Sequence, residues 1–375
     1  MAARITDEAL AELEESVGVV LKDRPQPHIE QLTPDTIRHF AWGAGDDNPL
    51  WLDKEYAAAS VHGGILAAPC TLYAADRTVS GYVNGLPGVH ALFAGTDWRW
   101  HRPLRAGDAI SAEPSLKGIE IKPSAFSRRT IKQTFQVRFL DQAQDLVADA
   151  DSWVFRTERD TAREVGKYAE VPVQTRYDTD QIDEIAAAYR SYRRRGAEPL
   201  LWEDVDEGVP LPELLKGPLT VTGMIAWDQG WGGLYIRAHG MAFALFDAHP
   251  ALAIPNGQGV PDVPERVHWD QELATGIGAP GPYDYGPERI TWLSQLVTDF
   301  IGDGALLRRL NVQVRRFNVI GDLTRCRGTV TRKYRDGDRH LIECTLGAVN
   351  QRDELTAQGL AVAELPSAST GPVLG

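Results

Sequence analysis

The pattern of hydrophobic and polar positions predicts a helical beginning. Residues 6–22 and 32–42 carry apolar side chains at helical spacing, with Thr6 or Asp7 as the expected cap of the first helix and Thr33 as that of the second. Residues 53–59 continue as a further helical turn. Residues 63–75 are apolar on nearly all sides, which predicts a helix enclosed by other elements rather than one lying on a surface.

Strand-like segments follow directly at residues 90–102, 108–121, 128–140 and 146–157. Each alternates or clusters β-branched and aromatic side chains, and turn residues separate one segment from the next. This order of elements predicts one buried helix against an antiparallel sheet. Residues 158–200 do not show the strand pattern. Their first part is densely charged, and a helix is expected between Tyr177 and Tyr192.

The second half of the chain repeats the first. Residues 219–228 parallel the helix that begins at residues 32–33, and residues 267–274 parallel residues 50–57 in register. A second apolar helix at 285–297 precedes expected strands near 305–318, 322–335, 338–350 and 355–363. The second half also carries a Gly-, Pro- and Ala-rich stretch, roughly 231–263, and connections of that length are usually functional or mobile.

The length of 375 residues fits two domains of ordinary size. We expect an N-terminal helix at 1–27, an N-terminal domain at 28–158, a linker at 159–200 and a C-terminal domain at 201–375. Hydrophobic residues make up 43% and charged residues 24%, which are ordinary globular values. The N-terminus lacks a signal-peptide core and no run approaches the ~20 apolar residues of a membrane helix, so the cytoplasm is the expected location.

The net charge of −13 argues against a nucleic-acid surface, which would normally be basic. An anionic small ligand remains compatible with it, because screening confines the field of a local Arg or Lys to roughly 8–10 Å. Cys70, Cys326 and Cys344 are widely separated and lack metal-type spacing. They support neither a disulfide framework nor a zinc site, and no metal or other cofactor is predicted.

The clearest chemistry lies in residues 45–51, Gly-Asp-Asp-Asn-Pro-Leu-Trp. An aspartate on a glycine-opened turn, followed by Asn-Pro-Leu, fits a loop that carries a general acid or base between two structured elements. Asp46 can also be explained as a cap or Asx-turn residue. Where such a loop would complete an acid/base pair with histidine the chain has Trp51, so any imidazole must come from elsewhere.

The first helix, the Gly-Asp-x-Asn-Pro-Leu loop, the buried helix and the wrapping sheet resemble a hot-dog domain of the MaoC-like dehydratase family, the (R)-specific enoyl-CoA hydratases. Outside its N-terminal helix and linker, the chain is similar to the double-hot-dog acyl dehydratases with a fungal fatty-acid-synthase-type dehydratase half. The resemblance implies an α+β tandem hot-dog fold, each half a long buried helix wrapped by an antiparallel sheet. It also implies that an acyl-CoA or acyl-carrier thioester binds between the halves, where an Asp/His pair adds or removes water across the α,β double bond.

The pair is split in this chain. Asp46 and Asn48 match the family motif, but Trp51 stands at its histidine position. In the second half His268 stands at that position, while the aspartate position falls near residues 232–233. Three interpretations remain open. His268 recruits another carboxylate, Asp46 and His268 cooperate, or both sites are inactive and the protein binds a thioester without turning it over. The carboxylates nearest in sequence to His268 are Asp228, Asp262, Asp270 and Asp284.

The candidate catalytic residues are therefore His268, Asp46 and Asp284. The candidate substrate-binding residues are Asn48, Gly64, Tyr283, Tyr285, Gly286, Arg289, Arg128 and Arg316. Gly64 and Gly286 stand where a backbone N–H at the start of a buried helix would stabilise the enolate of the thioester. His268 can alternatively be a packed core histidine, and Arg289 either forms an ion pair or faces the ligand. Arg128 and Arg316 are candidates for the CoA phosphates.

These features predict a hydro-lyase that acts on an acyl-CoA thioester. A non-catalytic acyl-thioester-binding or partner subunit is the first alternative, and a hot-dog thioesterase is another, because the fold hosts that chemistry too. We also expect a homodimer or higher oligomer, with no nucleic-acid or membrane partner.

Overall fold

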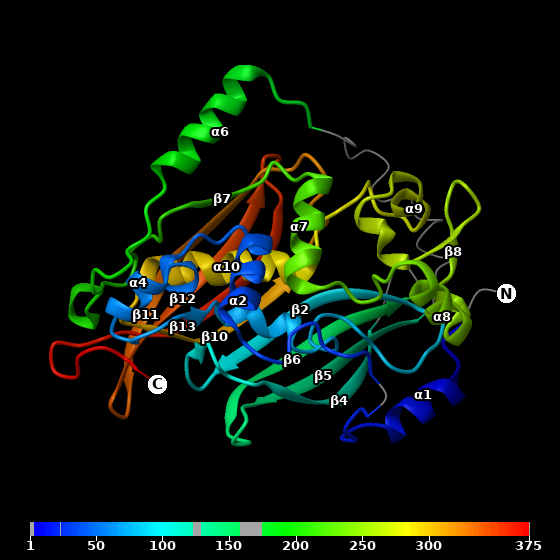
Figure 1. Ribbon diagram of the computed structural model, residues 1–375, viewed down its shortest axis with the longest axis horizontal. Helices are drawn as coiled ribbons and strands as arrows, with labels where there is room; N and C mark the ends of the chain where they lie inside the picture. The colour runs from blue at the N-terminus through cyan, green and yellow to red at the C-terminus, as the bar shows by residue number, and fades with distance from the viewer. Residues whose placement is uncertain (1–3, 23, 123–128, 158–174, 375) are drawn as a thin grey trace.

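The computed structural model describes residues 4–22, 24–122, 129–157 and 175–374. Its centre is a nine-stranded antiparallel sheet in the order β4-β5-β6-β2-β10-β13-β12-β11-β7 (Figure 1). The strands are β2 (His90–Trp100), β4 (Ser111–Lys122), β5 (Thr130–Leu140), β6 (Leu146–Thr157), β7 (Leu214–Lys216), β10 (Leu306–Val314), β11 (Thr324–Asp336), β12 (Arg339–Asn350) and β13 (Leu355–Glu364). The strand segments expected from the sequence are confirmed, with ends that differ by a few residues.

The two halves of the chain meet in the middle of this sheet, where β2 pairs with β10. Residues 95–99 lie opposite residues 309–313 in antiparallel register. Across this seam the guanidinium of Arg309 donates to both carboxylate oxygens of Asp97, at 2.8 and 2.9 Å. The halves therefore share one continuous sheet rather than forming two separate ones.

The central helix of the second half is α10 (Gly286–Ile301), which crosses one face of the sheet (Figure 1). All of its residues except Gly286 and Thr298 are buried, and Ile290, Leu293, Leu296 and Val297 have no exposed surface. Pro287 lies in its first turn, where a missing N–H costs no helical hydrogen bond. The helix expected at 285–297 is confirmed and runs about one turn further.

The long buried helix expected at residues 63–75 of the first half is wrong. Strand β1 (Leu66–Ala67) pairs there with β3 (Leu104–Arg105), and a short 3-10 helix, η1 (Pro69–Ala74), follows. Gly63, with φ at 69°, and Pro69 interrupt the helical path. Cys70, Leu72 and Tyr73 are fully buried. The apolar residues on all sides of 63–75 therefore predicted burial correctly, but they did not determine whether the segment forms a long helix.

Helices α2 (Pro34–Ala44) and α7 (Val221–Trp231) are the matching helices of the two halves and pack against each other (Figure 1). Each has 11 residues, and each begins at a threonine cap, Thr33 or Thr220, whose hydroxyl accepts a backbone N–H. Each also ends at a glycine in the left-handed region, Gly45 or Gly232. The cap expected at Thr33 is confirmed.

The contact between α2 and α7 is reciprocal. Gly43 lies against Ala226 and Trp227, and Gly230 lies against His39 and Phe40. Counted from the capping threonines, the two glycines hold the same helical position, and so do the residues that they contact. This symmetry fixes the register of the repeat, and it places Gly233 at the position of Asp46.

Further α-helices lie within the described residues. They are α1 (Asp7–Glu15), α3 (Pro49–Leu52), α4 (Lys54–Ala59), α6 (Thr179–Ser191), α8 (His239–Ala248) and α9 (Gln271–Gly276). The first helix is shorter than the expected 6–22, and the stretch at 231–263 contains α8 and the small β8 (Ile254–Pro255) and β9 (Pro261–Asp262) pair. The expected linker at 159–200 lies partly outside the described residues. Among those described, no helix is long and apolar enough to span a membrane.

Candidate functional sites

Residues 45–48 connect α2 to α3 in the first half, and Pro49, Leu50 and Trp51 of the motif lie in α3. Asp46 is only 4% exposed, and its Oδ1 accepts the backbone N–H of Asn48 at 3.1 Å. Its Oδ2 accepts the indole N–H of Trp51 at 3.0 Å. Asn48 in turn caps α3 by accepting the N–H of Leu50 at 3.0 Å. The geometry is that of the Asx-turn alternative, and both carboxylate oxygens of Asp46 accept a hydrogen bond from within the loop and α3.

Asp46 belongs to a buried cluster of charges beside the C-terminal end of α10. The ammonium of Lys216 donates to the carbonyls of Ala44 and Gly45, both at 2.9 Å. Asp299 of α10 accepts from the hydroxyl of Tyr192 at 3.0 Å. Burial, followed by the charge of Asp46, raises the pKa of Asp299 to about 7, and burial also raises the pKa of Asp46. The cluster brings Tyr192, near the end of the expected linker, together with Asp46 of the first half and Asp299 of the second.

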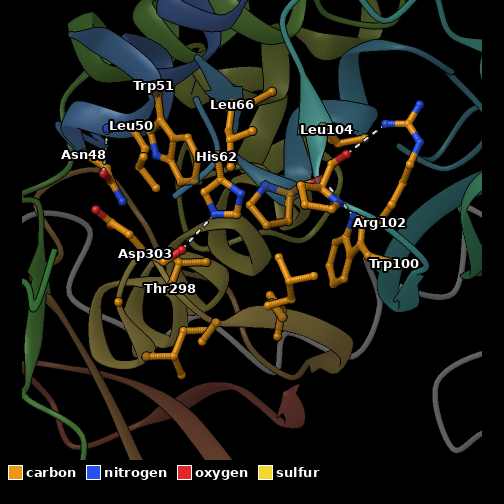
Figure 2. Close-up of a pocket in the computed structure, with 18 of the residues that line it drawn as sticks. Asn48, Leu50, Trp51, His62, Leu66, Trp100, Arg102, Leu104, Thr298 and Asp303 are labelled. Carbon is orange, nitrogen blue, oxygen red and sulfur yellow. Dashed lines mark hydrogen bonds between the residues drawn. The ribbon is translucent and has the colours of Figure 1, made fainter. Parts of the chain in front are cut away.

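A cavity of about 60 Å³ opens between this loop and the end of α10 (Figure 2). Its wall is mainly apolar and includes Leu50, Trp51, Leu66, Trp100, Leu104, Ile301 and Leu307. Asn48 is among the described lining residues, whereas Asp46 is not. The first half therefore keeps a pocket next to the motif, but the motif carboxylate does not face it.

His62 also lines this cavity and was not considered from the sequence. Its Nε2–H donates to the carbonyl of Asp303 at 2.8 Å, so the lone pair is on Nδ1. Nδ1 is buried and has no hydrogen-bond partner among the described residues. Burial lowers the pKa of His62, which keeps the ring neutral. Its position depends on Asp303, far along the chain, and no local pattern around residue 62 reveals that contact.

In the second half, His268 ends the 3-10 helix η4 (Pro264–His268) and precedes α9. Its Nδ1–H donates to the carbonyl of Tyr283 at 2.7 Å, so Nε2 carries the lone pair. The ring stacks on Tyr285 with 3.7 Å between centroids. Burial lowers the pKa of His268 to about 4. At neutral pH the side chain is therefore a neutral imidazole with a fixed tautomer and an acceptor at Nε2.

Asp228 is connected to His268 through Tyr285. The hydroxyl of Tyr285 donates to Oδ2 of Asp228 at 3.3 Å, and Oδ1 is buried without a partner in the described chain. Burial, and then the charge of Glu265, raises the pKa of Asp228 to about 7. Two of the carboxylates nearest to His268 in sequence are engaged elsewhere, because Asp262 lies 3.4 Å from Arg266 and Asp270 caps α9.

Asp284 and Arg289 form a buried ion pair at the start of α10. Nε of Arg289 donates to Asp284 at 2.8 Å, and Nη2 donates to the other carboxylate oxygen. Nη1 donates to the carbonyls of Arg316 and Thr356, both at 2.8 Å. The ion-pair alternative for Arg289 fits these contacts, and Asp284 is held by Arg289 rather than directed at His268.

The remaining candidates are spread over the structure. Gly286 begins α10 as expected, but an added Cβ there would lie 2.3 Å from the ring of Phe93 of β2, which crowds the start of the helix. Gly64 has open space beside it but precedes a strand instead of a helix. Tyr283 packs edge-on against His268. Arg316 is 57% exposed and pairs with Glu354 at 3.0 Å, while Arg128 lies outside the described residues.

Comparison with known sequences gives matches in the first half. Residues 21–149 match the family model described as the FAS1-like dehydratase domain region. A UPF0336 protein of Parafrankia sp. is 34% identical over 94 residues, which are 24% of this chain and 62% of that protein. A UPF0336 protein of Streptomyces avermitilis is 29% identical over 91 residues, 23% of this chain and 61% of that protein. The chain thus spans about three fifths of the length of these relatives.

Solved structures match nearly the whole chain. A MaoC-like dehydratase has a TM-score of 0.63 at 18% identity and covers 95% of this chain and 100% of its own. A conserved hypothetical protein from Mycobacterium tuberculosis, described as having a double hot-dog fold, has a TM-score of 0.53 at 14% identity, covering 93% and 96%. The chain has the double hot-dog fold of the MaoC-like dehydratases. The resemblance drawn from residues 45–51 and from the internal repeat is confirmed.

The two candidate sites of this double hot dog lie at opposite ends of α10. Asp46 is close to Asp299 in the last turns of the helix, whereas His268 stacks on Tyr285 just before its first turn. At a rise of ~1.5 Å per residue, Tyr285 and Asp299 are roughly 20 Å apart. Asp46 and His268 therefore do not form a pair, and the interpretation in which they cooperate is wrong.

Proposed function

We propose that this double hot dog is a hydro-lyase that adds water to, or removes water from, the α,β double bond of an acyl-CoA thioester, with its acid/base chemistry at His268. The observation that carries the proposal is the state of that side chain. The Tyr283 carbonyl holds Nδ1–H, the neutral ring is fixed on Tyr285, and the Nε2 lone pair is left as an acceptor. The match of the first half to a FAS1-like dehydratase region also supports it.

Hydration needs a group that accepts a proton from water as its oxygen attacks the β carbon, and a group that delivers a proton to the α carbon. An Asp/His-type couple meets this need by holding one water between a carboxylate and an imidazole. The thioester oxygen needs hydrogen-bond donors as enolate charge develops. The start of α10 has no side-chain cap in the described chain, and the helix dipole favours negative charge there.

The test is a survey of short, branched and aromatic enoyl-CoA thioesters, following the loss of the conjugated thioester absorbance. His268→Gln is expected to lower kcat/KM by about 10²–10⁴-fold, the usual range for a general acid or base. His249→Gln is the matched control, since His249 is exposed at the end of α8. A wild-type protein that hydrates none of the thioesters, or a His268→Gln variant as fast as wild type, rejects the proposal.

A second candidate is a non-catalytic acyl-thioester-binding or partner subunit. Two contacts favour it: Trp51 donates to Asp46 in the first half, and Phe93 crowds Gly286 in the second. Calorimetric binding of an acyl-CoA without turnover, with activity appearing only on mixing with another hot-dog subunit, would support this candidate. Release of free CoA, measured with a thiol reagent, would instead identify a thioesterase. The expected homodimer or higher oligomer belongs to either proposal, and light scattering tests it.

A further inference from the structure

The second half lacks an aspartate at its counterpart of Asp46, and another carboxylate fills that space. The helix register places Gly233 at the position of Asp46, with φ at 60°. A Cβ built on Gly233 would lie 2.7 Å from Cδ1 of Ile236 and 3.2 Å from Oε1 of Glu265. The carboxylate of Glu265 therefore lies next to the place where the side chain of an aspartate at position 233 would begin.

Glu265 also makes the backbone hydrogen bond that the motif aspartate makes in the first half. There, Oδ1 of Asp46 accepts the N–H of Asn48, two residues further along. In the second half the N–H two residues after Gly233 belongs to Tyr235, and Oε2 of Glu265 accepts it at 2.6 Å. Oε1 accepts the N–H of Leu234, also at 2.6 Å. The same loop is thus held by a carboxylate that comes from a different segment.

Glu265 is well placed relative to His268. Both belong to η4, and in a 3-10 helix side chains three residues apart lie on the same face. Glu265 is 5% exposed and carries charge-assisted bonds from two N–H groups, whereas Asp228 accepts only the Tyr285 hydroxyl among the described residues. Arg77, whose guanidinium holds the carbonyl of Trp231 at 3.0 Å, adds positive charge nearby. Burial raises the pKa of both carboxyls, but the two N–H bonds and Arg77 oppose that rise at Glu265, which favours Glu265 over Asp228 as the anion of the site.

We infer that Glu265 is the catalytic carboxylate that works with His268, moved from the loop after α7 to the turn that carries the histidine. This inference rests on the proposed hydro-lyase function. Nε2 of His268 accepts a hydrogen bond from one O–H of the attacking water, which stays on the oxygen, and Glu265 takes the other proton as the new O–C bond forms at the β carbon. The electron pair of the double bond moves to the thioester enolate. Glu265 then returns that proton to the α carbon as the thioester carbonyl re-forms, which completes the addition of one water; dehydration runs the same steps in reverse.

Glu265→Gln tests this role because it keeps the shape of the side chain and an acceptor for one backbone N–H. We expect kcat to fall by about 10²–10⁴-fold with KM nearly unchanged, as for loss of a general base. Glu272→Gln is the control, because Glu272 is exposed in the first turn of α9. Thermal unfolding of each variant separates a lost base from a lost fold.

The second arm returns the carboxylate to the family position. Gly233→Asp combined with Glu265→Ala is expected to be at least tenfold faster than Glu265→Ala alone, because aspartate tolerates the left-handed backbone that Gly233 adopts and the flexible end of Ile236, 2.7 Å from the added Cβ, can turn aside. A Glu265→Gln variant within threefold of wild type in kcat, or a folded double variant no faster than Glu265→Ala, overturns the inference. If Glu265→Gln does not fold, the double variant decides alone. A failure of the proposed function is distinguished by an inactive wild type.

Discussion

The ion pair between Asp284 and Arg289 provides the sharpest test of which residues hold the fold and which do the chemistry. The side chains are 0% and 2% exposed, respectively. Arg289 also joins the start of α10 to the carbonyls of Arg316 and Thr356, and Asn318 donates to Asp284 at 3.3 Å. We predict that Asp284→Asn acts mainly on stability, although the sequence alone had suggested a catalytic role.

The expected magnitude follows from the charge that the substitution leaves behind. Asp284→Asn removes the counterion of a guanidinium that is almost fully buried, and breaking a buried pair in this way costs about 3–5 kcal/mol. That is a large part of the ~5–15 kcal/mol by which a typical domain is stable. Replacing both partners, as in Asp284→Leu with Arg289→Met, is expected to cost less than Asp284→Asn alone, because no unpaired charge remains.

The assay is urea unfolding followed by tryptophan fluorescence, with the dependence on urea compared between variants to check that the transition is unchanged. Asp35→Asn is the control, because Asp35 makes an exposed pair with Arg38 and such pairs contribute ~0–1 kcal/mol. An Asp284→Asn protein that loses less than about 1 kcal/mol but has no activity would refute the reasoning. It would return Asp284 to the active site.

Three further predictions concern pH, helix packing and the first-half motif. The kcat/KM for hydration is expected to fall as the pH is lowered toward the His268 pKa of about 4, because protonation removes the acceptor at Nε2. It is also expected to fall above about pH 7, because ionised Asp228 opposes the negative charge of the enolate. Asp228→Asn should abolish this alkaline fall, and a wild-type profile that is flat with pH contradicts the prediction. Gly230→Ala should cost about 1–3 kcal/mol in urea unfolding, because its Cβ would lie 2.6 Å from the His39 carbonyl, whereas Gly240→Ala, with open space, should not. Trp51→His should restore no turnover to a His268→Gln protein, since Asp46 is outside the cavity wall; recovered enoyl-CoA hydration would show otherwise.

Much of the fold could be predicted because its signals are local. The caps at Thr33 and Thr220 precede apolar residues at helical spacing, and the strands alternate β-formers, so the repeat could be aligned before the halves were seen in contact. The failure at residues 63–75 has a physical cause. Burial on all sides is required of any segment enclosed between a sheet and α10, whether it is a long helix or, as here, a short strand and a 3-10 helix.

Residues of the candidate site could be predicted only where a side chain of suitable chemistry also stands at a position fixed by the internal repeat or by a helix end. His268 could be found because it repeats the position of Trp51, and Gly286 because it precedes an apolar helix. Glu265, the proposed partner of His268, could not be singled out because its hydrogen-bond partners, Leu234 and Tyr235, lie about thirty residues earlier and reach it only through the path of the 231–263 stretch. The spacing of Asp284 and Arg289 could not say whether they face a ligand or each other, because both faces of the start of α10 are enclosed.

The hydrogen bonds of the two halves separate the structural work of the motif carboxylate from its chemistry. Asp46 satisfies the N–H of Asn48, and Glu265 satisfies the equivalent N–H of Tyr235, so each loop keeps a carboxylate whether or not the site is active. The two halves differ in the side chain at the histidine position of the motif, which is Trp51 in the first half and His268 in the second. Trp51 is a donor, and its indole N–H uses the second oxygen of Asp46. His268 presents an acceptor at Nε2. A water can donate to this nitrogen and to a carboxylate at the same time, but the nitrogen itself cannot donate a hydrogen bond to the carboxylate. Both oxygens of Glu265 also accept an N–H, from Leu234 and Tyr235, so the halves differ in the side chain beside the carboxylate, Trp51 or His268, and not in whether the carboxylate is hydrogen-bonded.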